Sequence, residues 1–212
     1  SQAGVTFSAN VDATTFTITD TTGTVTFADG QDVDITTDLV TANAGYDVSI
    51  QSATFDAAGD TDFLNTGSVT LGNTDTDVLS FSGGLATTGN GSNPAPVSAA
   101  GTIQTTDTQM DIGAVTLSAD TTFDTGNAGA GVLNVGAVSG AFALTLDSGA
   151  TTGATIGLTS MTDLTGGLTV RDAGGLVTIG DVGSGTAGAV TITNSQAGVT
   201  FSANVDATTF TI

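Results

Sequence analysis

The chain of 212 residues contains no cysteine, histidine, tryptophan, lysine or glutamate. Without cysteine the sequence has no disulfide framework and no thiolate metal site. Without cysteine, histidine and lysine, the usual pairs of a nucleophile and its base cannot be built, so we expect no enzyme. The lack of glutamate and lysine also removes two strong helix formers.

Positive charge is almost absent as well. Arg171 stands alone against 21 acidic residues, all of them Asp, and the formal net charge is −20. A nucleic-acid partner is therefore excluded, because phosphates are bound through a basic surface. No apolar run approaches the roughly 20 residues of a membrane-spanning helix, so we expect no membrane span in this part of the protein.

Thr, Val, Ala, Gly and Asp make up most of the chain. Thr and Val favour β-strands, whereas Gly, Asp and Asn favour turns. The apolar share of 39% and the mean hydropathy of +0.27 argue against a disordered acidic tail, which lacks the apolar residues needed to form a core. The composition therefore favours an all-β fold.

An internal repeat is the most informative feature of the chain. Residues Ser1–Ile18 recur letter for letter as Ser195–Ile212, an offset of 194 residues. Such a recurrence indicates a tandem array. We therefore interpret residues 1–194 as one repeat unit and residues 195–212 as the start of the next, in a continuous solenoid.

Short apolar–polar–apolar triplets recur along the unit, with the period of two that is typical of a strand with one buried face. They are residues 5–7, 16–18, 25–27, 33–35, 48–50, 69–71, 79–81, 115–117, 133–135, 144–146, 168–170, 177–179 and 190–192. Turn residues lie between them. If one coil takes two or three strands, it needs about 20–22 residues, and about nine coils fill the unit.

A weaker internal match supports this estimate. Gly4–Ala9 resembles Gly113–Ala119 at an offset of about 109 residues, which is near five coils. The sequence thus predicts a parallel β-helix with Val, Ile, Leu and Phe inside, Thr largely outside and Gly and Asn at the corners. Leu85–Ala100 holds both prolines and shows no alternation, so we expect a bulging loop there, either a contact point or a tolerated insertion.

The drifting pattern G-[AV]-V-T-[LF]-x-A-[ND], separated by Gly, Asp and Asn turns, resembles the β-strand repeats of large secreted bacterial surface proteins. These include filamentous-haemagglutinin-like exoproteins, autotransporter passengers and giant repeat adhesins. The resemblance implies a right-handed parallel β-helix, export from the cell and a role as an extracellular or cell-surface fibre or adhesin.

Three Asp-x-Asp pairs suggest calcium. Asp32 and Asp34, Asp60 and Asp62, and Asp75 and Asp77 each place two carboxylates on one side of an extended segment or around a turn. Hard oxygen ligands suit Ca²⁺, which is the one cofactor we consider. The alternative is that these aspartates only form turns and keep the protein soluble.

The unit holds 20 of the 21 Asp and Arg171, hence a charge of −19. Over a rod of about 43 Å this is about one charge per 2.3 Å, close to the density of duplex DNA. Such rods should associate only when cations screen them. We expect Arg171 to pair with Asp172 or with an Asp of a neighbouring coil, as an ordinary surface ion pair.

The sequence therefore predicts a structural fibre protein whose main partner is itself, end to end and side by side, with cell-surface or matrix polysaccharide as a further partner. The first alternative is the stalk of an adhesin with a binding tip elsewhere in the chain. An ice-binding solenoid is the second, suggested by Thr15-Phe16-Thr17 and Thr24-Val25-Thr26, although the irregular coil spacing argues against it.

Overall fold

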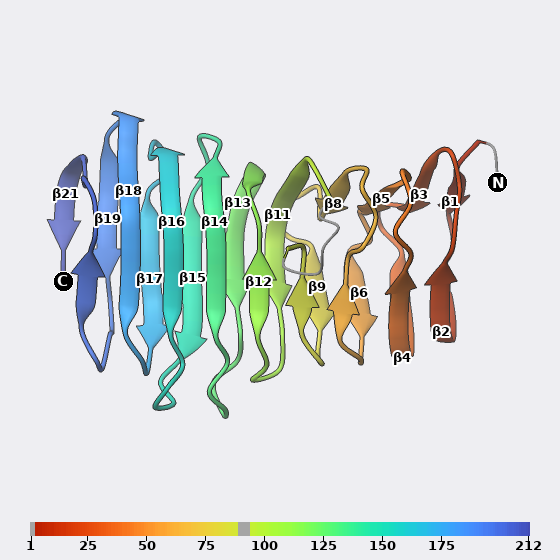
Figure 1. The fold of residues 1–212 in the computed structure, drawn as a ribbon, viewed down its shortest axis with the longest axis horizontal. Coiled ribbons are helices and arrows are strands. Elements are labelled where there is room, and N and C mark those ends of the chain that lie inside the picture. The colour runs from red at the N-terminus through yellow and green to blue at the C-terminus, as the bar shows by residue number, and fades with distance from the viewer. Residues whose placement is uncertain (1–2, 89–93) are drawn as a thin grey trace.

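The structure is a computed structural model that describes residues 3–88 and 94–212. None of these residues lies in a helix, and their 21 strands form one sheet in which neighbouring strands pair in parallel. Figure 1 shows the strands stacked side by side along one long axis, with the two ends of the chain at opposite ends of the stack. The predicted β-solenoid is confirmed.

Each coil has three faces, which we number in chain order. The strands of face 1 are β1 (Val5–Phe7), β3 (Thr24–Phe27), β5 (Asp47–Ile50) and β8 (Val69–Leu71). Those of face 2 are β6 (Thr54–Ala57), β9 (Val78–Phe81), β15 (Leu144–Gly149), β17 (Leu168–Ala173), β19 (Gly188–Ile192) and β21 (Ala207–Thr211). Those of face 3 are β7 (Thr61–Asp62), β10 (Leu85–Ala86), β12 (Met110–Ile112) and β20 (Val199–Phe201).

Seven longer strands bend around a corner and belong to two faces. Faces 1 and 2 share β11 (Val97–Gln104) and β13 (Val115–Asp124). Faces 2 and 3 share β2 (Val11–Ile18) and β4 (Asp32–Thr41). Faces 3 and 1 share β14 (Leu133–Ser139), β16 (Ile156–Asp163) and β18 (Val177–Thr186).

One ladder of stacked inward residues runs along each face. Ladder 1 is Val5, Val25, Val48, Val69, Val97, Val115, Val138, Met161, Val182 and Val205. Ladder 2 is Val11, Val33, Phe55, Leu79, Ile103, Phe123, Leu146, Val170 and Ile192. Ladder 3 pairs Phe16 with Leu39, and then stacks Thr61, Leu85, Met110, Leu133, Ile156, Val177 and Val199.

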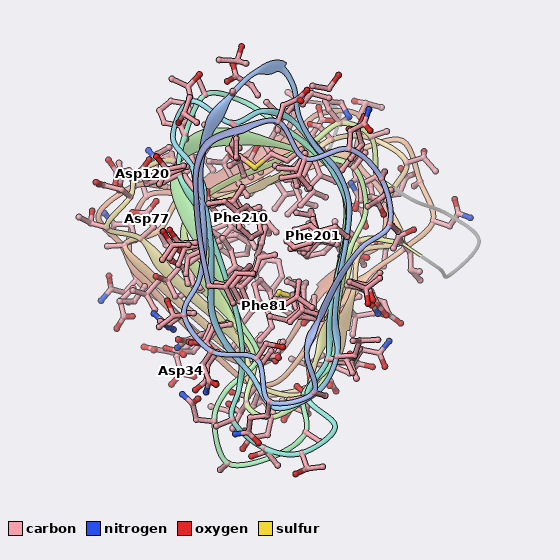
Figure 2. All side chains as sticks on the ribbon, turned by 90° about the vertical axis from the view of Figure 1, so that its left-hand side faces the viewer. Asp34, Asp77, Phe81, Asp120, Phe201 and Phe210 are labelled. Carbon is pink, nitrogen blue, oxygen red and sulfur yellow. The ribbon has the colours of Figure 1, made fainter. Side chains whose placement is uncertain are left out.

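The ladders give the coil length directly. Ladder 1 takes nine steps from Val5 to Val205, which averages about 22 residues a coil and agrees with the predicted spacing. Val5 and Val115 are five steps apart, as the weaker sequence match predicts. In Figure 1, face 2 strands such as β15 point down and face 3 strands such as β12 point up. Figure 2 views the stack from its C-terminal end, with Asp34 of face 2 on the left and Phe201 of face 3 on the right. The chain therefore runs down on the left and up on the right while it advances toward the viewer, which is a right-handed winding.

Phenylalanine rings form a continuous stack through the N-terminal half of the interior. Phe27 lies 5.4 Å from Phe7 and 5.6 Å from Phe55 between ring centroids, and Phe55 lies 5.4 Å from Phe81. Phe27, Phe55 and Phe81 are fully buried. Figure 2 shows Phe81 inside the ring of the coil, whereas Asp34 and Asp120 lie outside it. Edge-to-face and offset ring pairs of this kind add to the stability that burial alone provides.

The expectation that Thr lies largely outside holds only in part, because several Thr side chains are buried. Thr41 shows what a buried hydroxyl does at a corner. Its Oγ1 donates to the carbonyl of Asp62 at 2.8 Å and accepts from the amide of Leu64 at 2.7 Å. The side chain thereby joins β4 to the next coil where no strand ladder is formed, and satisfies backbone groups that would otherwise be costly to bury.

The corners are made by bulges and by glycine. Gly101 lies in the bend of β11 with a φ of 77°, in the left-handed region, and an added Cβ would lie 2.4 Å from the carbonyl oxygen of Asp77. Only glycine fits this close approach without strain.

The loop predicted for Leu85–Ala100 is shorter than expected. Its first two residues form β10, which pairs with β7 and β12, and its last four belong to β11. The triplet criterion misses both strands because they are short or rich in small residues. Pro94 and Pro96 lie between them, whereas residues 89–93 are outside the described part of the chain.

The second copy of the repeated segment stacks on the coil before it. Val199 pairs with Val177, and Val205 forms a bridge with Val182. The ring pair of the first copy also recurs: the centroids of Phe7 and Phe16 are 5.3 Å apart, and those of Phe201 and Phe210 are 5.1 Å apart, both edge to face. The solenoid is therefore continuous from one copy to the next.

Candidate functional site: the outward columns

An outward column of mainly acidic residues follows face 2 along the rod. Each member comes directly after a residue of ladder 2, except at the bulge near Arg171, so its side chain points outward. The column is Asp12, Asp34, Asp56, Ser80, Gln104, Asp124, Asp147 and Asp172. We call it the aspartate column; neighbouring members are about 4.8 Å apart along the axis.

The N-terminal end of the aspartate column is exposed and uncompensated. Asp12, Asp34 and Asp56 are all exposed, and no hydrogen bond or ion pair of their carboxylates is found within the described part of the chain. Like charges directly opposite one another on adjacent strands destabilise the sheet. This end of the column therefore attracts cations from solution.

The middle of the column is neutral, and Gln104 donates from Nε2 to the Ser80 hydroxyl at 2.9 Å. Such a bond satisfies both side chains across two coils. It also separates the exposed carboxylates at the N-terminal end from a second acidic group further along the rod.

Arg171 neutralises that second group. The Nη2 atom lies 2.8 Å from Asp124 Oδ2, and Nε donates to Asp147 Oδ2, so one guanidinium contacts two successive coils. Asp147 is buried at 2% exposure and also accepts from the amide of Gly149 at 2.8 Å. Burial alone would lower the pKa of Arg171, but its bonds to Asp147 and Asp124 outweigh this effect and raise that pKa.

A bulge directs Arg171 to this position. Val170 pairs with Leu146 and Asp172 with Asp147, so Arg171 is an extra residue between two ladder pairs. The sequence predicted a surface ion pair with Asp172 or with a neighbouring coil. The structure confirms the pairing with a neighbouring coil, through Asp147, and adds Asp124 of the coil beyond it; Asp172 is not a partner of the guanidinium in the described part of the chain. Asp172 accepts from Asn194 at 2.7 Å.

Asp32 and Asp34, the first predicted calcium pair, both point outward from β4. The carboxylate of Asp32 accepts a hydrogen bond from the hydroxyl of Thr54, its partner on the next coil. Asp34 belongs to the aspartate column. The two side chains thus share a face, and one of them is already engaged by a neighbouring coil.

Asp60 and Asp62, the second pair, line a hollow of about 350 Å³ together with Asp111. Burial and the charge of Asp62 raise the pKa of Asp60. The carboxylate of Asp111 accepts hydrogen bonds from the side-chain amides of Gln109 at 2.6 Å and Asn134 at 2.7 Å. The third carboxylate of the hollow therefore has donors within the protein.

Asp75 and Asp77, the third pair, are separated by burial. Asp77 is 2% exposed and closes a turn, where its carboxylate accepts from the amide of Asn73 at 2.7 Å and from the amide and hydroxyl of Thr74 at 3.1 and 2.7 Å. Asp75 is exposed. In the described ranges, no group of three or more acidic side chains has the arrangement of a metal site.

Asp47 shows a third use of a carboxylate, as a clamp between coils on face 1. It accepts from the amide of Ser68 at 2.6 Å and from the Ser68 hydroxyl at 2.8 Å. These hydrogen bonds, first from the amide and then from the hydroxyl, lower the pKa of Asp47. Charge-assisted bonds of this kind are stronger than neutral ones.

Face 1 carries a different outward column, of hydroxyl groups. Its members are Thr6, Thr26, Ser49, Thr70, Ser98, Thr116 and Ser139. This hydroxyl column is one residue wide: Thr24 pairs with Asp47, and on β2 Thr15 pairs with Asp38 and Thr17 with Val40. The Thr-x-Thr pairs considered for ice binding are therefore not repeated from coil to coil.

Comparison with protein-family models, with curated proteins and with solved structures found no match. In the part of the chain that the structure describes, there is no helix long and apolar enough to cross a membrane. Function is therefore inferred from geometry and charge.

Proposed function

We propose that this chain is a segment of a stiff, strongly acidic extracellular rod that builds a fibre at the cell surface. The observation that carries the proposal is the unbroken ladder 1, which runs from Val5 to Val205 and into a second copy of the starting sequence. A stack in which every coil contacts only its neighbours can be lengthened by adding coils at its end. In such a stack, each repeated unit makes the rod longer.

The last coil of the stack has apolar side chains on its open side. Phe210 and Ile212 are exposed at 45% and 80%, although residues of the same type are buried within the rod. Figure 2 shows Phe201 and Phe210 facing the viewer inside the last coil. The last coil therefore exposes the same kind of apolar side chain that the interior coils bury.

The acidic surface determines how such rods associate. Rods that carry −19 per unit repel one another at low salt, and the exposed Asp12, Asp34 and Asp56 concentrate this charge on face 2. In this proposal Ca²⁺ acts between rods, by screening and bridging carboxylates with hard-oxygen coordination, rather than in a cage within one coil.

Rod length can be measured directly. Purified chains of one, two and three units should give particles in solution scattering and electron micrographs that lengthen by about 42 Å per unit at constant width. Antibodies against the unit should label intact, non-permeabilised cells along filaments. Particles that grow in all dimensions, or labelling that requires permeabilisation, would contradict the proposal.

Side-by-side association of the rods can be measured separately, with NaCl as the control for ionic strength. Light scattering of the rods should rise with CaCl₂ and fall with chelator, whereas NaCl of equal ionic strength should have a smaller effect. A triple variant with Asp12, Asp34 and Asp56 changed to Asn should lose most of the difference between CaCl₂ and NaCl, because it lacks the exposed carboxylates that Ca²⁺ would bridge. If calcium and sodium act equally at matched ionic strength, bridging by calcium is wrong, and general screening remains.

A further inference from the structure

The two copies of the repeated segment have the same sequence but occupy different faces. In the first copy, Val5 lies in ladder 1, Val11 in ladder 2 and Phe16 in ladder 3. In the second copy, the equivalent Val199 lies in ladder 3.

The other residues of the second copy follow the same shift. Val205 lies in ladder 1, beside Val182. Phe210 lies on face 2, where it pairs with Val190. Every position of the second copy is displaced by one face from its equivalent in the first.

The shift follows from the number of coils in the unit. From Val5 to Val182, ladder 1 takes eight steps. Two further faces, at Val190 and Val199, complete the 194 residues. One unit therefore spans eight complete coils and two further faces. This is one face short of nine coils.

The register shift that forms a corner occurs at equivalent residues in both copies. In the first copy, the register of β2 with β4 shifts between Ala13 and Thr15, at the corner between faces 2 and 3. In the second copy, the equivalent Ala207 and Thr209 flank the register shift of β21 with β19, now at the corner between faces 1 and 2. The corner is thus encoded in the segment itself and is used on either side of the rod.

We propose that successive units of the array are rotated by one face about the fibre axis, so that the fibre repeats after three units, or about 26 coils. This inference rests on the proposed tandem fibre only for its continuation past Ile212. The coil that covers the C-terminal end then has the sequence of Thr19–Thr41, because this segment covers the first copy, where Phe7 pairs with Phe27 and Phe16 with Leu39.

The rotation changes the surface that the fibre presents. The aspartate column lies on face 2 in this unit, on face 1 in the next and on face 3 in the one after. It therefore steps around the rod with a period of about 125 Å instead of forming one acidic stripe. Each side of the rod presents the hydroxyl column, the aspartate column and the outward side chains of face 3 in turn. Cation-bridged neighbours can therefore approach from three directions and form bundles rather than flat sheets.

Disulfide trapping tests the face shift in the 212-residue chain, which has no native cysteine. Thr178 and Thr200 are exposed partners on face 3, so the double variant Thr178→Cys, Thr200→Cys should form an intramolecular disulfide under mild oxidation. The comparison variant is Thr193→Cys, Asp206→Cys, which would be cross-linked if the second copy occupied the same faces as the first. Trapping of the second pair in preference to the first would overturn the proposal.

An extended chain tests the covering segment. A copy of Thr19–Thr41 placed after Ile212 should slow amide hydrogen exchange of residues 199–211 by about tenfold or more, because their strands gain a neighbour on the open edge. The same 23 residues in scrambled order serve as the control. Equal exchange in both extended chains would contradict the proposed stacking. Cross-linking and exchange report on the purified chain, so they can succeed even if no filament is found on cells.

Discussion

Arg171→Gln is the substitution that tests the electrostatics of the rod most directly. The guanidinium is bonded to Asp124 and Asp147, and Asp172 stacks on Asp147 in the same column. Without the cation, three carboxylates remain stacked about 4.8 Å apart, with the middle one buried. We expect the variant to be less stable than the natural chain.

The magnitude follows from the spacing. Two unit charges about 4.8 Å apart repel by about 0.9 kcal/mol in water and by about 3.5 kcal/mol at an effective dielectric constant of about 20. The side chain of Arg171 is 50% exposed, so solvent screening brings the loss toward the lower figure. We expect about 2 kcal/mol of lost stability, which corresponds to a fall in Tm of about 4–8 °C for a chain of this size.

Thermal denaturation followed by circular dichroism at about 20 and about 500 mM NaCl measures this loss. The loss should shrink at high salt, and Arg171→Gln with Asp147→Asn should recover most of it, because the middle charge is then absent. Thr178→Asp changes the net charge equally at an exposed site whose ladder partners are Gly157 and Thr200, and it serves as the control. If Arg171→Gln costs no more than this control, or the double variant recovers nothing, the reasoning is refuted.

Further substitutions test the other acidic positions and the core. Asp34→Asn should raise Tm at low salt by about 2–4 °C, because it removes repulsion from both neighbours in the column; an unchanged Tm would argue against stacked charges. Asp47→Asn should be destabilising at pH 7, with a deficit that disappears as the pH falls below about 4, because the folded pKa of Asp47 is lowered. Asp60→Asn should do the opposite, stabilising at pH 7 with a gain that vanishes toward about pH 4, because its folded pKa is raised; Tm measured from about pH 3 to 7 distinguishes the two signs. Phe81→Ala should lower the free energy of unfolding, measured by urea denaturation, by about 4 kcal/mol, whereas Phe142→Ala, at 39% exposure, should lower it far less; equal losses would mean that burial of Phe81 in the ring stack adds no stability.

The strands were predictable because their signal is local. All the triplets named from the sequence lie within strands, including the isolated Leu79–Phe81 in β9 and Val190–Ile192 in β19. Met110–Ile112 and Ile156–Leu158 have the same alternation and could have been found. Thr61 in β7 could not, because a buried threonine on a strand of two residues carries no periodic signal.

The columns and faces were not predictable in the same way. Which aspartates stack depends on every coil length between them, and the steps of ladder 1 vary from 18 residues, between Val97 and Val115, to 28, between Val69 and Val97. Bulges add or skip residues at corners without changing the alternation on either side. The pairing of Arg171 with Asp124, 47 residues away, therefore requires the three-dimensional register.

The pairing of each strand only with the coils next to it has a kinetic consequence. Across the whole stack, partners are separated by roughly one coil, and this separation stays the same however many units follow. The relative contact order therefore falls as the array becomes longer, whereas in most β-proteins distant pairings slow folding. A finished coil offers a paired edge and an apolar surface to the next 22 or so residues, so folding can proceed as a zipper from either end. The time needed to add one coil should then be independent of the number of coils already stacked.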